Sequence, residues 1–111
     1  MTPRTPADIL REAKRLIEEK GWTQGTYARD SRGEACDWNG ATALCFCAEG
    51  AMFAAAEALR ADAGAECAAG FLIEQVTPAP SIVAYNDQPG RSREDVIAIF
   101  DKAIALAEAQ P

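Results

Sequence analysis

TALCFCAEGAMFAAAEALRAD, residues 42–62, is the stretch that decides the fold, because alanine dominates it. It predicts one long central helix that runs from about Thr42 to Asp62 and ends at Gly64. Gly50 and its alanine neighbours are small, so we expect another helix to approach closely. The same residues would also suit a dimer seam, and the sequence does not separate a homodimer from an intramolecular core.

Two amphipathic helices flank this stretch at the ends of the chain. The first has Thr5 as N-cap, Pro6 at the first helical position and Asp8 in capping-box position. The last begins at Ser92, and Asp95 is placed to reach back in the same way. We expect these helices to clamp the central one. Their apolar stripes are Ile9, Leu10, Ala13, Leu16 and Ile17 in the first, and Val96, Ile97, Phe100, Ala103, Ile104 and Ala107 in the last.

Weaker patterns fill the rest of the chain. Residues 22–38 suit a β-hairpin around the turn DSRG, with an aromatic side chain packed on a helix. Residues 64–76 predict a shorter helix, and the prolines in 77–91 predict an extended connector. The sequence therefore predicts one mainly α domain over residues 1–111. This domain is a small bundle of about four helices, with a short β-hairpin between the first and the second.

The composition of the chain excludes several classes of catalytic and metal site. The chain has no histidine, which removes Ser/His/Asp and Cys/His nucleophiles and HExxH zinc sites. Its net charge is −6, divided unevenly: residues 1–33 carry seven Lys/Arg against five Asp/Glu, and residues 34–111 carry four against twelve. An acidic body repels phosphate backbones, so we expect no direct nucleic-acid binding and favour a protein partner. The chain shows no signal peptide and no apolar run long enough for a membrane span, so we expect a cytoplasmic protein.

Cysteines and carboxylates are the candidate metal ligands. Cys45 and Cys47 are two residues apart, which on a helix would point them in different directions, so we expect buried thiols and assign no metal or cofactor. Cys36, beside polar residues, would be an exposed thiol. Convergent carboxylates would suit acid/base chemistry or a hard metal ion, although ordinary turn and surface roles are favoured. The carboxylates in question are Asp30, Glu34, Asp37, Glu49 and Asp87.

A polar cluster, YNDQPGRSRED at residues 85–95, is the best candidate ligand site. Arg91, Arg93 and the free N–H groups from Ser92 onward would hold an anion such as a phosphate, and Tyr85 would supply a stacking face. Ordinary turn and capping roles remain the alternative reading of the same residues. The candidate ligand-binding residues are Trp22, Tyr85, Asn86, Asp87, Arg91 and Arg93, and no catalytic residue is assigned.

Several short motifs also carry a resemblance. They are GW at 21–22, DxxG at 30–33, FCAEGAM at 46–52, and YND at 85–87 followed by SREDVIAIFDKAI. This pattern resembles a family of small uncharacterised proteins of actinobacteria, other bacteria and phages, with Tyr85 where that family often has tryptophan. The resemblance implies a shared fold and a phage or prophage relation, without a mechanism. The matching positions are Trp22, Asp30, Gly33, Cys47, Gly50, Ala51, Asn86 and Asp87.

Three functions follow as expectations. The first is a non-enzymatic small binding protein, phage- or prophage-related, that engages a protein partner through an acidic helical surface. The second is a module that binds a phosphate-bearing small molecule or nucleotide at the N-terminus of the last helix. The third is a metal-assisted hydrolase that uses Asp30, Glu34 or Asp87.

Overall fold

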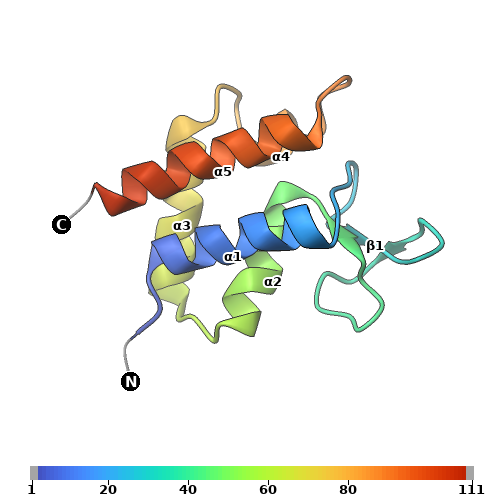
Figure 1. The fold of residues 1–111 in the computed structure, drawn as a ribbon, viewed down its shortest axis with the longest axis horizontal. Coiled ribbons are helices and arrows are strands. Elements are labelled where there is room, and N and C mark those ends of the chain that lie inside the picture. Colours follow the sequence, from blue (N-terminus) through green and yellow to red (C-terminus); the bar gives the residue numbers. More distant parts are fainter. Residues whose placement is uncertain (1–2, 110–111) are drawn as a thin grey trace.

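The computed structural model describes residues 3–109 and is mainly helical, with a small antiparallel sheet. Helices α1 and α5 lie side by side, and α3 packs on both (Figure 1). Helix α2 packs chiefly on α1, on the side away from α5, so the two end helices do not clamp the central helix between them as expected. The sheet sits near the end of α1. In the described part, no helix is both long and apolar enough to cross a bilayer. The elements are α1 (Pro6–Glu19), β1 (Ala28–Arg29), β2 (Ala35–Cys36), β3 (Cys45–Phe46), α2 (Ala48–Ala58), α3 (Ala63–Val76), α4 (Ile82–Asn86) and α5 (Arg93–Glu108).

Both end helices begin as predicted. The Thr5 hydroxyl accepts a hydrogen bond from the Asp8 N–H at 3.1 Å, and the Asp8 carboxylate accepts from the Thr5 N–H at 2.9 Å. Ser92 and Asp95 form the same capping box at the start of α5. The predicted stripe of α1 is confirmed in full. In α5 the most buried residues are Val96, Ile99, Phe100 and Ala103, and the predicted Ile97, Ile104 and Ala107 are partly buried beside them.

The prediction of one long central helix over residues 42–62 is wrong at both ends. Residues 42–47 form turns and β3 instead, because the backbone of Leu44 to Cys47 pairs with the segment around β1: the Leu44 N–H donates to the Arg29 carbonyl at 2.9 Å. Helix α2 starts only at Ala48, with Cys47 as its N-cap, and it ends at Ala58. Gly64 does not end it, but lies in the first turn of α3.

The predicted hairpin is confirmed and gains a third strand. The strand order is β2-β1-β3, with Ala28 opposite both Cys36 and Phe46. In the DSRG turn the Gly33 N–H donates to the Asp30 carbonyl at 3.0 Å, and Gly33 has a φ of 79° that suits glycine.

Gly50 does mark a close approach, but its neighbour is not a helix. A Cβ at position 50 would lie 2.2 Å from the carbonyl oxygen of Tyr27, in the segment that leads into β1. The Cys47 N–H donates to that same carbonyl at 3.0 Å, which holds the two segments together. The small-residue face of α2 is therefore buried within the chain.

The connector at 77–91 contains a helix that the sequence did not predict. Ser81 caps α4, and Ile82 and Tyr85 are buried against the rest of the protein. A five-residue helix is too short to be stable alone, so this burial stabilises it. The described residues thus form five helices rather than about four.

Candidate functional site

Asn86 is a fully buried polar side chain that joins three segments. Its Oδ1 accepts hydrogen bonds from Trp22 Nε1 at 2.7 Å and from the Ala48 N–H at 2.9 Å. Its Nδ2 donates to the Thr23 carbonyl at 3.1 Å and to Asp87 Oδ1 at 2.9 Å. Two accepted and two donated bonds use the full capacity of an amide, so Asn86 holds the structure together and has no donor left for a ligand.

Asp87 continues this connection at the end of α4. Its Oδ1 also accepts from the Gly25 N–H at 3.0 Å, while Gln24 Nε2 donates to the carbonyls of Asn86 and Gln88 at 2.9 and 3.0 Å. The structure therefore brings Trp22, Asn86 and Asp87 together, as the predicted site requires. Their hydrogen bonds attach residues 22–25 to the end of α4.

Arg91 lies next to this connection and bonds to groups of the same chain. Its guanidinium carbon is 3.7 Å from the centre of the Tyr85 ring, and its Nε donates to the Tyr85 carbonyl at 3.0 Å. Its Nη1 is 3.6 Å from Asp95 Oδ2, and its Nη2 donates to Gln88. Tyr85 was expected to stack on a ligand, and in the structure its ring stacks on an arginine of the same chain.

The N-terminus of α5 already holds an anion of its own. Hydrogen bonds from Ser92, aided by Arg91, hold the pKa of the Asp95 carboxyl below its ordinary value, so this group is charged where a phosphate was expected. Arg93 is exposed and pairs with its neighbour Glu94 at 3.2 Å. The geometry at this helix end does not favour an anion ligand.

Two of the candidate catalytic carboxylates, Asp30 and Asp87, are bonded within the chain. Asp30 Oδ1 accepts from the N–H groups of Arg32 and Glu34 at 2.9 and 3.1 Å, and Asp87 is bonded as described above. Between residues 3 and 109 no three His, Cys, Asp or Glu side chains are grouped to hold a metal ion.

The four cysteines are free thiols, and the expectation of buried thiols is confirmed only for Cys47, while Cys36 is less exposed than expected. Cys45 is in β3, so the helical-wheel argument about Cys45 and Cys47 had a wrong premise. Cys47 Sγ accepts from the Gly50 N–H at 3.3 Å, and burial raises the pKa of its thiol, which keeps it protonated. Cys36 is half-buried, and Cys67 is exposed.

A different feature stands out between α2, α3 and α4: a cavity of about 310 Å³ that we call the acidic groove. Its carboxylates are Glu49 from α2 and Glu66 and Glu74 from α3. Apolar side chains line the space between them, namely Met52, Phe53, Ile73, Ile82 and Val83. The groove thus combines apolar walls with three acidic groups.

The charges of the acidic groove are not balanced. Burial, together with the nearby charge of Glu74, raises the pKa of the Glu49 carboxyl. Glu74 Oε1 accepts a hydrogen bond from the Ile82 N–H at 2.7 Å, and no lysine or arginine lines the groove. None of the ion pairs within residues 3–109 includes Glu49, Glu66 or Glu74. The groove is therefore complementary to a cation.

Sequence reasoning named Glu49 among scattered carboxylates but missed its partners in the groove. A signal was present, because Glu66, Gly70 and Glu74 follow one another at intervals of four along α3 and so share one face. That Glu49 lies opposite this face depends on how α2 and α3 pack.

Comparison with known proteins adds one match. A family model described as "Family of unknown function (DUF6197)" matches residues 1–106. No match is found among curated proteins or among solved structures. The expectation of a family without an assigned function is confirmed at that level.

Proposed function

The chain belongs to DUF6197, a family of unknown function, and we propose that it is a non-enzymatic binding protein whose acidic groove engages a basic segment of a protein partner. The observation that carries this proposal is the set of three carboxylates without counter-charges above apolar walls. A ligand that brings both a cation and an apolar surface would satisfy both features.

Lysine and arginine side chains have this dual character. Their aliphatic stems pack on apolar surface while their charged ends stay near water and acidic groups. Such a side chain between Glu49 and Glu74 would relieve the repulsion that raises the pKa of Glu49. Each partly exposed ion pair adds only about 0.2–1 kcal/mol, so the apolar walls must supply much of the affinity.

The charge of the whole protein supports the same partner. Its net charge of −6 attracts a basic segment from a distance and speeds the encounter. The partner we propose is therefore an amphipathic segment with lysines or arginines beside apolar residues.

A matched pair of variants tests this function. The triple variant Glu49→Gln, Glu66→Gln, Glu74→Gln removes the groove charges, and Glu18→Gln, Glu34→Gln, Glu57→Gln makes the same change in net charge at exposed sites elsewhere. Binding of lysine-rich amphipathic peptides is followed by fluorescence anisotropy, and the site is mapped by NMR shifts. We expect shifts on α2, α3 and α4, and at least tenfold weaker binding in the groove variant alone. Equal weakening in both variants, or shifts elsewhere, would show general acidic attraction and overturn the proposal.

Other expectations from the sequence stay predictions. The phosphate site and the metal-assisted hydrolase have no geometry in their favour, since Arg91, Asp87 and Asp30 are bonded within the chain. A phage or prophage relation is part of our proposal, and the genomic neighbourhood of the gene tests it.

A further inference from the structure

A hollow beside the acidic groove, which we call the Tyr27 hollow, lies between the segment before β1, the N-cap of α2 and α4. Its volume is about 340 Å³. The residues that line it are Gly25, Thr26, Tyr27, Cys47, Val83 and Asp87. Val83 also lines the acidic groove, so the two spaces are neighbours on one face of the protein.

Two aromatic rings join these spaces. Phe53 of α2 lines the acidic groove, and the centre of its ring is 5.6 Å from the centre of the Tyr27 ring, with the two planes 70° apart. The Tyr27 side chain is 47% exposed, so much of it is open to a ligand. An aromatic surface therefore continues from the acidic groove into the Tyr27 hollow.

The Tyr27 hollow is acidic as well. Within residues 3–109 the carboxylate of Asp87 accepts hydrogen bonds from Gly25 and Asn86, and both fall on Oδ1. None of the ion pairs in this part of the chain includes Asp87, so its Oδ2 is left for a further donor. No lysine or arginine lines the hollow. Arg29 comes near Gly25, but its guanidinium donates to three groups of its own segment, residues 23–33.

An exposed aromatic ring beside a carboxylate is the surrounding that suits arginine. A guanidinium is planar and weakly hydrated, so it stacks on a ring while its N–H groups donate to a carboxylate. A lysine ammonium is a compact, strongly hydrated charge and gains less from the ring. This chain already holds an arginine in this way, since Arg91 stacks on Tyr85 at 3.7 Å and its Nη1 lies 3.6 Å from Asp95 Oδ2. Tyr27 and Asp87 offer the same two kinds of contact to an arginine from outside.

We propose that the Tyr27 hollow binds an arginine side chain of the partner's basic segment, stacked on Tyr27 and paired with Asp87. This inference rests on the proposed function, because the acidic groove next to the hollow binds the rest of the same segment. The carboxylates of the groove select positive charge of either kind. The Tyr27 ring adds the preference for arginine over lysine.

Two amphipathic peptides of the same sequence, one with arginine and one with lysine at every basic position, test this preference. Fluorescence anisotropy measures their binding to the full chain at one ionic strength. We expect wild type to bind the arginine peptide about fivefold more tightly, as a cation–π contact at a partly exposed site implies. Tyr27→Leu removes the ring, keeps an apolar side chain and is expected to abolish most of this advantage.

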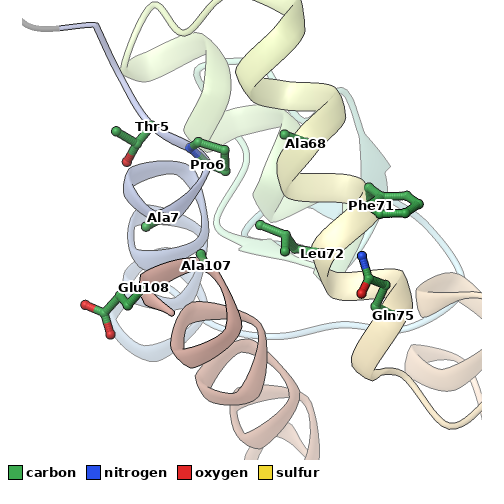
Figure 2. A pocket seen from close by; sticks show the side chains of 9 residues that line it. All are labelled: Thr5, Pro6, Ala7, Ala68, Phe71, Leu72, Gln75, Ala107 and Glu108. Atoms are coloured by element: carbon green, nitrogen blue, oxygen red, sulfur yellow. The ribbon is translucent and has the colours of Figure 1, made fainter. Parts of the chain in front are cut away.

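Phe71→Leu is the matched control. It makes the same ring-to-leucine change at a side chain that is 67% exposed. Phe71 belongs to a separate hollow between α1, α3 and α5 (Figure 2). This variant is expected to keep the full preference for the arginine peptide.

NMR of the wild-type complex gives a readout that needs no variant. Nuclear Overhauser contacts are expected between the Tyr27 ring and the side chain of one peptide arginine, together with amide shifts at Val83 and Asp87. A saturated complex without these contacts overturns the inference.

The binding data separate this inference from the proposed function. Equal affinity of wild type for both peptides overturns the arginine site alone when binding still weakens in the triple variant of Glu49, Glu66 and Glu74. An arginine preference that Tyr27→Leu and Phe71→Leu lower equally, or that neither lowers, does the same. Peptide binding that does not respond to the triple variant overturns the proposed function, and the inference that rests on it.

Discussion

Replacing Gly50 by alanine adds one methyl group where the structure has no room for it. The new Cβ would lie 2.2 Å from the carbonyl oxygen of Tyr27, 2.9 Å from its carbonyl carbon and 3.1 Å from its Cα. These are backbone atoms, so no rotamer change relieves the contact, and either α2 or the segment before β1 must move. Overpacking of this kind costs about 1–3 kcal/mol. Movement also weakens the hydrogen bond from Cys47 to Tyr27, worth about 1 kcal/mol.

An opposing effect of alanine reduces this loss. Alanine is a better helix former than glycine by about 1 kcal/mol, so the net destabilisation expected for Gly50→Ala is about 1–3 kcal/mol. Urea unfolding measures it as a lower midpoint at an unchanged slope.

Gly70→Ala is the matched control for this experiment. Position 70 is also helical, but a Cβ there meets nothing within 4 Å. This variant is expected to gain about 0.5–1 kcal/mol from helix propensity alone. If Gly50→Ala were neutral, or as stabilising as Gly70→Ala, the close approach of α2 to Tyr27 would be refuted.

Four further predictions concern polar groups. Asn86→Ala leaves Trp22 Nε1 and the Ala48 N–H without their acceptor. Each buried unpaired group costs about 1–3 kcal/mol, so the free energy of unfolding measured in urea should fall by at least about 2 kcal/mol. A smaller loss would mean that water replaces the amide. Glu49 has a raised pKa in the folded protein, so its charge costs no stability below the ordinary pKa of 4.5 and destabilises fully above the raised value. Glu49→Gln should therefore raise the melting temperature at pH 7 and leave it unchanged at pH 3, and a gain of equal size at both pH values would contradict the assignment. Ser92→Ala removes the cap of α5 and should cost about 1 kcal/mol. The pKa of Asp95 is lowered in the folded protein, so the stabilisation that this carboxylate adds is present above pH 3.8, its ordinary pKa, and is lost as the pH falls through the pKa of the folded state. Thermal melts of wild type and Asp95→Asn test this. A difference in melting temperature that stays the same down to low pH would argue against it.

The sequence by itself determined the elements that depend on local interactions. Each end helix starts with a cap and an acidic residue three positions later, and its apolar stripe repeats at helical spacing. These contacts span a single turn, so they form wherever the segment lies in the fold. The DSRG turn belongs to the same class, since Asp30 bonds to residues only two to four positions away.

Contacts between distant segments decided the rest. Residues 42–47 carry a helical composition, but pairing with Ala28 and Arg29 draws Cys45 and Phe46 into a sheet. Ladder hydrogen bonds and burial of Phe46 outweigh helix propensities, which differ by less than about 1 kcal/mol per residue.

The candidate surfaces have the same origin. Glu49 faces Glu74 because α2 and α3 pack together, and Tyr27 lies beside Asp87 because hydrogen bonds attach residues 22–25 to the end of α4. Residue spacing along one helix predicts which side chains share a face. Which two faces meet is set by burial summed over the whole core, and that sum exists only in the folded chain.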